Sequence, residues 1–250
     1  MLRLTREVRF AIRPDGTLPP DGRNGFAGRP SLEGLGLHLV LRVTLAGDID
    51  PATGYLRNIV EVDRDVRSRA VPVVQRFLVE KRWHERTALV LALRESLSDS
   101  TAQLDAIELC FSPFLRCSTH TREPGMVRTH QRFEFSAAHR LHNPKLSDEQ
   151  NRAAFGKCNN PLGHGHNYEL EIELVGAGRS TSEVEQLVER HAIEPLDHKH
   201  LNQEVPEFAT LNPSVENIAN VIFTRLKPYL SELAAVRVWE TPKTWAEWRE

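Results

Sequence analysis

Three histidines in the second half of the chain have the spacing of a shared metal site. His164 and His166 are separated by one residue. On an extended strand, residues two apart point to the same side, so both imidazoles can reach one ion. His139 ends a predicted strand that an antiparallel neighbour would bring alongside them. Three histidine ligands leave the fourth position of a tetrahedral zinc open, as in catalytic sites.

A second interpretation of these histidines stays open. The chain has eleven histidines, and a His-x-His pair taken alone more often marks a surface strand or loop. His142 is a substitute ligand by residue type, but we expect it to lie in a loop.

Cys158 is the candidate for thiol chemistry. It follows Lys157 in a polar Gly/Asn stretch, six positions before His164. A nearby cation or metal lowers the pKa of a thiol, which favours a thiolate base or nucleophile. Cys110 and Cys117 are more typical of inert buried cysteines.

Three acidic residues and one further histidine complete the candidate set. Asp197 precedes His198, and a carboxylate can orient an imidazole and stabilise its charged form, although adjacent residues need not touch. Glu240 interrupts an apolar strand, where a carboxylate either faces water or holds a planar amidine-like group through paired hydrogen bonds. Glu216 lies in the first turn of a predicted helix, where a carboxylate complements the helix dipole.

The elements that would position these residues occur twice. Apolar and polar residues alternate from Leu39 to Leu45 and again from Tyr168 to Leu174, a period of two that predicts half-buried strands. The closing segments 106–113 and 235–242 also match, and both matches have an offset of 129 residues. Two matches at one offset indicate a tandem duplication, in which each half has opening, second and closing strands and helical material.

Local signals place the other elements and the boundary. Ser180 with Glu183 predicts a capping box for a helix that runs to about Ala192. Pro213 suits the first turn of a second helix. Pro124 and Gly125 predict a linker within 119–126, and the Pro/Gly-rich segment 14–30 predicts a loop.

Composition excludes several classes of protein. The net charge is −2 over 250 residues, which argues against a bulk nucleic-acid or membrane-surface role. Three cysteines without a CxxC pair argue against a disulfide framework and fit a reducing compartment. Without a signal-peptide or membrane-spanning segment, we expect a cytoplasmic protein.

Ordered motifs over about residues 130–242 resemble the 6-pyruvoyl-tetrahydropterin synthase family. They read FSAAHRL, FGKCNNPLGHGHNY, PLDHKHLN, PSVEN and ETP. The resemblance implies an α+β tunnelling fold: two tandem units, each a small antiparallel sheet with helices on one face, that oligomerise into a barrel. It further implies a degenerate, non-catalytic half at residues 1–122 and a catalytic half at 128–250.

The same resemblance implies roles for individual residues. His139, His164 and His166 would bind Zn²⁺, Cys158 would be the proton-abstracting base, and Asp197 and His198 would complete its relay. Glu240, assisted by Glu216, would hold the pterin. The expected substrate is the small molecule 7,8-dihydroneopterin triphosphate, and the expected product is 6-pyruvoyl-tetrahydropterin or the 6-carboxytetrahydropterin of queuosine biosynthesis. We expect a homo-oligomer, and no nucleic-acid or membrane partner.

The sequence departs from the family pattern in two places. The expected turn and third strand are shortened after Gly176, whereas the first half has a fuller version that predicts a hairpin at Asp48–Asn58. Subtracting 129 from the site positions gives residues without zinc or thiol chemistry: Phe10, Arg29, Leu35, Leu37, Ser68, Arg69 and Phe111. The alternative functions are a zinc- or pterin-binding module without turnover, a purely structural barrel protein and a generic zinc hydrolase.

Overall fold

The structure is a computed structural model that describes residues 2–19, 34–98, 103–176 and 179–250. The chain divides into two compact units, Met1–Thr129 with Gly176–Gly178, and His130–Val175 with Arg179–Glu250. Each unit buries its own apolar cluster. Arg29 and residues 20–30 of the predicted loop lie outside the described residues.

The sheet of the first unit is antiparallel throughout. Its strands follow chain order: β1 (Leu2–Ile12), β2 (Leu37–Gly47), β3 (Leu104–Ser112) and β4 (Leu115–His120). Alternate residues of β2, from Leu39 to Leu45, are buried, as the period-two pattern predicts. The other face of β2 includes the polar residues Arg42 and Thr44.

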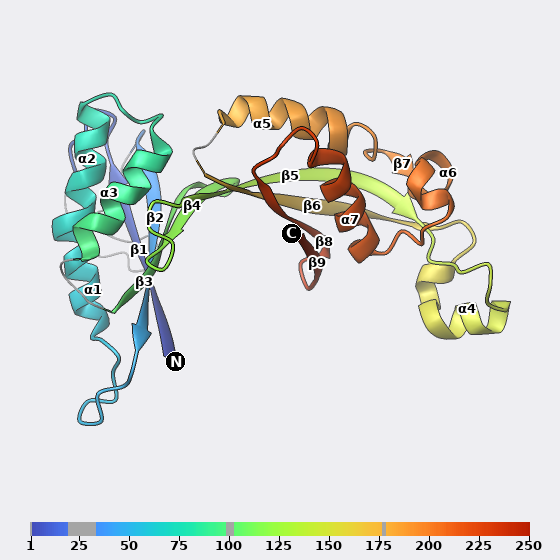
Figure 1. Cartoon of the computed structure of the whole chain (residues 1–250), viewed down its shortest axis with the longest axis horizontal. Helices are drawn as coiled ribbons and strands as arrows, with labels where there is room; N and C mark the ends of the chain where they lie inside the picture. The colour runs from blue at the N-terminus through green and yellow to red at the C-terminus, as the bar shows by residue number, and fades with distance from the viewer. Residues whose placement is uncertain (1, 20–33, 99–102, 177–178) are drawn as a thin grey trace. The chain divides into compact units, whose positions relative to one another are not determined.

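The helices of the first unit cover one face of that sheet (Figure 1). They are α1 (Ile59–Asp65), a π-helical turn (Val66–Ala70), α2 (Val71–Val79) and α3 (Arg86–Ser98). Asn58 is the N-cap of α1, and its side chain accepts a hydrogen bond from the backbone N–H of Val60. Leu89, Val90, Leu93 and Leu97 form the buried stripe of α3.

The second unit has a sheet of the same strand order. It contains β5 (Arg128–His139), β6 (His164–Val175), β8 (Leu233–Thr241) and β9 (Thr244–Arg249), and the short β7 (Lys199–His200) pairs parallel to the end of β5. Contacts of Arg132 with Glu171 and of Ser136 with Asn167 show that β5 and β6 run antiparallel. The end of β5 therefore lies beside the beginning of β6, and β7 lies beside the end of β5.

Two helices, α5 (Thr181–Val188) and α7 (Val215–Leu226), lie on the same face of this sheet (Figure 1). A π-helical turn (Glu189–Ile193) extends α5 to the length predicted. The remaining helical elements lie near the ends of β5 and β7: α4 (Asp148–Phe155), α6 (Leu201–Glu204) and 3₁₀ turns at Gly156–Asn159 and Pro206–Ala209. The α+β class with antiparallel sheets is confirmed.

Three local expectations are corrected. Asp48–Asn58 is a series of turns and not a hairpin, because Asp50 accepts hydrogen bonds from the Ala52 and Gly54 N–H groups and folds the segment on itself. Pro213 precedes the helix, whose N-cap is Ser214. Within the predicted linker, residues 119 and 120 belong to β4, so the turn begins at Thr121.

In each unit, charged side chains on three neighbouring strands alternate in sign. The central side chain is a carboxylate in the second unit and a guanidinium in the first. In the second unit, Glu171 is only 2% exposed and accepts hydrogen bonds from Arg132 (3.0 Å) and Arg237 (2.6 Å). In the first unit, Arg42 lies between Glu7 and Glu108 and donates to both. Each central residue occupies a buried or half-buried position on a middle strand, where an opposite charge on either side offsets desolvation.

Candidate active site

The three predicted metal ligands meet where the end of β5 lies beside the beginning of β6. His139 is the last residue of β5, and His164 and His166 lie on the same face of β6 at its beginning. The ring centroids of His139 and His164 are 4.5 Å apart, and those of His164 and His166 are 4.8 Å apart. The antiparallel pairing anticipated from sequence produces this arrangement.

A hydrogen bond fixes the orientation of the His139 ring. Its Nδ1 is 2.6 Å from the carbonyl oxygen of Pro213, so Nδ1–H donates and the Nε2 lone pair faces the other histidines. That Nε2 lies 3.1 Å from His164 Nε2. Burial lowers the pKa of His139 to about 4, with a further decrease from the neighbouring histidines. Neutral imidazoles that face one another with free lone pairs are suited to a shared cation.

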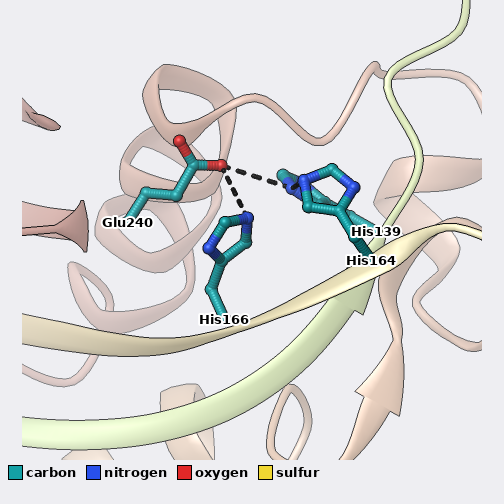
Figure 2. Close-up of side chains that lie close together, drawn as sticks. All are labelled: His139, His164, His166 and Glu240. Atoms are coloured by element: carbon teal, nitrogen blue, oxygen red, sulfur yellow. Dashed lines mark hydrogen bonds and ion pairs between the residues drawn. The ribbon is translucent and has the colours of Figure 1, made fainter. Parts of the chain in front are cut away.

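Glu240 lies beside the histidines. One carboxylate oxygen is 3.2 Å from His139 Nε2 and 3.4 Å from His166 Nε2 (Figure 2). Burial lowers the pKa of His166, whereas the Glu240 charge opposes that decrease. The donor atoms of His139, His164, His166 and Glu240 all lie within 4.8 Å of one another, and their chemistry fits a divalent transition metal such as zinc.

Asp197 and His198 are in direct contact, although neighbours in sequence seldom are. His198 Nδ1 is 2.7 Å from Asp197 Oδ2, and the other Asp197 oxygen accepts a hydrogen bond from the Ser136 N–H at 2.8 Å. Both hydrogen bonds lower the pKa of the Asp197 carboxyl group, and the bond from Ser136 has the larger effect. His198 has a φ of 56°, a left-handed conformation that is unusual for a residue other than glycine. This backbone lets the ring turn back toward its neighbour.

The remaining predicted residues lie outside these two groups. Cys158 is half-buried in the 3₁₀ turn after α4, and its carbonyl oxygen accepts a hydrogen bond from the Leu141 N–H at 2.9 Å. Within the described residues it is not part of the four-residue cluster. Glu216 is exposed in the first turn of α7. His142 lies in the loop after β5, as expected.

The structure adds His200 and Gly163, which sequence reasoning missed. His200 lines a shallow groove with His166 and His198. A side chain at Gly163 would place its Cβ 2.9 Å from His200 Nε2 and 2.9 Å from the His139 carbonyl oxygen. The φ of Gly163 is +74°, so both sterics and backbone conformation favour glycine there. A glycine followed by His-x-His was the available signal.

The second half of the chain matches a known protein family. The family model described as 6-pyruvoyl tetrahydropterin synthase matches residues 128–250. The 6-pyruvoyl tetrahydrobiopterin synthase of Homo sapiens is 40% identical over 120 residues, which cover 44% of this chain and 83% of that protein.

The chain belongs to the 6-pyruvoyl tetrahydropterin synthase family. Its named relatives are lyases, so this is an enzyme family. A 6-carboxy-5,6,7,8-tetrahydropterin synthase of Haemophilus influenzae is 29% identical over 154 residues, which cover 50% of this chain and 100% of that protein.

Solved structures extend the comparison to the whole chain. The 6-pyruvoyl tetrahydropterin synthase of Caenorhabditis elegans covers 50% of this chain and 96% of its own, with 35% identity and a TM-score of 0.48. The uricase of Arthrobacter globiformis covers 100% of this chain and 93% of its own, with 7% identity and a TM-score of 0.53. The second likeness concerns the fold alone, and antiparallel sheets covered by helices fit the tunnelling fold. In the described part of this chain, no helix is long and apolar enough to cross a membrane.

Proposed function

We propose that the chain is a zinc-dependent lyase that acts on 7,8-dihydroneopterin triphosphate and releases triphosphate. The single observation that carries this proposal is the convergence of three imidazoles and one carboxylate, with the Nε2 lone pair of His139 directed at the other members. The family membership supplies the substrate class. The 6-pyruvoyl product is favoured over the 6-carboxy product, because the pyruvoyl-forming relative is 40% identical and the carboxy-forming relative 29%.

In this proposal His139, His164 and His166 hold the zinc. A bound zinc supplies Lewis-acid chemistry, which acidifies a C–H bond next to a coordinated oxygen. The carbonyl oxygen of Pro213 keeps the His139 ring in the tautomer that ligation needs. Glu240 lies beside the three histidines and, with Glu216, contributes to binding the substrate.

Proton transfer is assigned to Cys158, Asp197 and His198. Asp197 stays ionised, because the hydrogen bond from Ser136 lowers the pKa of its carboxyl group. It holds the proton on His198 Nδ1, which leaves Nε2 available for exchange. The left-handed backbone of His198 costs energy, and such strain occurs preferentially at functional sites. The Cys158 thiol is the proposed base.

We further propose that residues 128–250 form the catalytic half and residues 1–122 a non-catalytic scaffold. Support comes from the same strand order in both units and from the location of the candidate metal cluster, which in the described residues lies in the second unit. Among the described strands, β1 pairs only with β2, and β9 only with β8. Such free edges favour a closed homo-oligomeric barrel.

The test is incubation of the zinc-loaded protein with 7,8-dihydroneopterin triphosphate and identification of the products by mass spectrometry. Cys158→Ala should keep zinc but lower turnover by about 10²–10⁴-fold, the usual cost of losing a general base. Cys110→Ala is the matched control, because that half-buried cysteine lies on β3. Triphosphate release by Cys158→Ala at the rate of the control would reject the assigned base.

The metal assignment has its own test. The double variant His164→Ala, His166→Ala should lose zinc in metal analysis, and His142→Ala should retain it. Full zinc occupancy in the double variant would reject these ligands, whatever the activity.

A further inference from the structure

A basic cleft lies in the first unit, between β1 and the helical segment that begins at Asn58. Its lining includes three arginines, Arg6 from β1 and Arg64 and Arg67 from the helical segment. Asp63 is the sole carboxylate among the residues that line it. The lining therefore carries two more positive than negative charges, in a chain whose net charge is −2.

Asp63 orients two of these arginines. Its Oδ1 accepts hydrogen bonds from Arg6 Nε at 3.0 Å and Arg6 Nη2 at 2.8 Å, and its Oδ2 accepts one from Arg67 Nε at 3.1 Å. The Arg6 and Arg67 side chains are still 39% and 27% exposed. Both guanidinium groups are thus held in place at the surface. Arg64 is exposed and stands outside these ion pairs.

The equivalent place in the second unit shows that the fold does not require arginine there. Buried residues have the same spacing in both helical segments: Val62, Val66, Ala70 and Val71 in one, and Val184, Val188, Ala192 and Ile193 in the other. This alignment matches Asp63 with Glu185, Arg64 with Gln186 and Arg67 with Glu189. Gln131 takes the role of Arg6, because it donates to Glu185 at 3.1 Å.

The corresponding cleft of the second unit is acidic as a result. Its lining includes Glu185, Glu189 and Glu194, with Arg190 as its arginine. One framework thus carries opposite charge in the two units. The arginines of the first unit are therefore explained by a ligand better than by packing.

We propose that the cleft lined by Arg6, Arg64 and Arg67 binds the phosphate groups of a phosphorylated small molecule. Guanidinium groups match phosphate oxygens with paired, charge-assisted hydrogen bonds, and a concave basic surface concentrates anions. Ser68 adds a hydroxyl group to the lining. Ile59 and Val60, which are 46% and 69% exposed, offer an apolar rim for the organic part of such a ligand. This proposal does not rest on the reaction assigned to the second unit.

The test is calorimetric titration of the full-length, metal-free protein with inorganic triphosphate at physiological salt. Arg64→Gln should weaken binding about tenfold or more, as expected for the loss of a charge-assisted hydrogen bond. Arg69→Gln is the matched control, because it removes the same charge from an exposed position five residues away and outside the cleft. Its affinity should stay within about twofold of the parent protein, because surface charges that make no contact with a ligand act weakly at this salt concentration.

Parallel titrations with orthophosphate and GTP distinguish the possible sources of the phosphate. Equal affinity for triphosphate and GTP would assign the site to phosphate alone, and tighter binding of GTP would assign a role to the Ile59–Val60 rim. No binding by the parent protein, or equal effects of Arg64→Gln and Arg69→Gln, would overturn the proposal. The proposal would also be overturned if Arg64→Gln bound triphosphate as the parent protein does but had an altered sedimentation coefficient. The cleft would then be an interface between copies of the chain.

Discussion

The buried His139 should make the metal-free protein lose stability in mild acid. Its imidazole is fully buried, and burial lowers its pKa from 6.5 to about 4. In the unfolded chain the same group takes up a proton near pH 6.5. Between these two values the unfolded state binds a proton that the folded state excludes, so acid favours unfolding.

The size of the effect follows from the two pKa values. One unit of pKa difference corresponds to about 1.4 kcal/mol, so His139 should cost the folded state about 3 kcal/mol by pH 4. This contribution is absent above pH 6.5, where the imidazole is neutral in both states. It grows as the pH falls and levels off below about 4. Burial also lowers the pKa of His166, which adds to acid sensitivity in the same direction.

His139→Gln isolates the contribution of His139, because glutamine is neutral at every pH. Free energies of unfolding are measured by urea titration in EDTA at several pH values from 7.5 to 4.0. Tryptophan fluorescence is the suitable signal, because Trp239, Trp245 and Trp248 all belong to the second unit. The variant should be less stable at pH 7.5, and the difference should shrink by about 3 kcal/mol toward pH 4. A difference that stays constant over this range would refute the account.

Three further predictions concern the framework around the site. Gly163→Ala should destabilise the protein by about 2–4 kcal/mol, from left-handed strain plus overlap with the His139 carbonyl oxygen. Gly54→Ala, at φ +72° in open space, should cost only about 1 kcal/mol in the same urea titration, and equal costs would contradict the steric argument. Glu171→Gln should cost about 2–4 kcal/mol, because it leaves two arginines beside a buried neutral group, whereas Glu169→Gln on the same strand, 46% exposed at its side chain, should cost under about 0.5 kcal/mol. A fragment of residues 126–250 should aggregate or lack activity if the first unit is a scaffold, and turnover at the full-length rate would show that the scaffold is dispensable.

The sequence by itself located several strands and singled out the histidines that we propose as metal ligands. Alternation of apolar and polar residues located β2 and β6, because one buried face on a pleated strand requires a period of two. The same period puts His164 and His166 on one side of β6, because they are two positions apart along the strand. The pattern failed for β9, whose residues are almost all exposed and therefore carry no apolar face. It failed for β4, where Cys117, Ser118 and Thr119 are buried in succession.

Only the tertiary structure decided which distant groups meet. Glu240 faces the histidines because β8 pairs with β6, and no local pattern specifies that register. Asp197 reaches His198 through a left-handed backbone that neither residue type predicts. The basic cleft joins Arg6 to Asp63 across 57 positions, and each residue alone is typical of a solvated surface. Propensity and periodicity act within one element, whereas these contacts depend on how separate elements pack together.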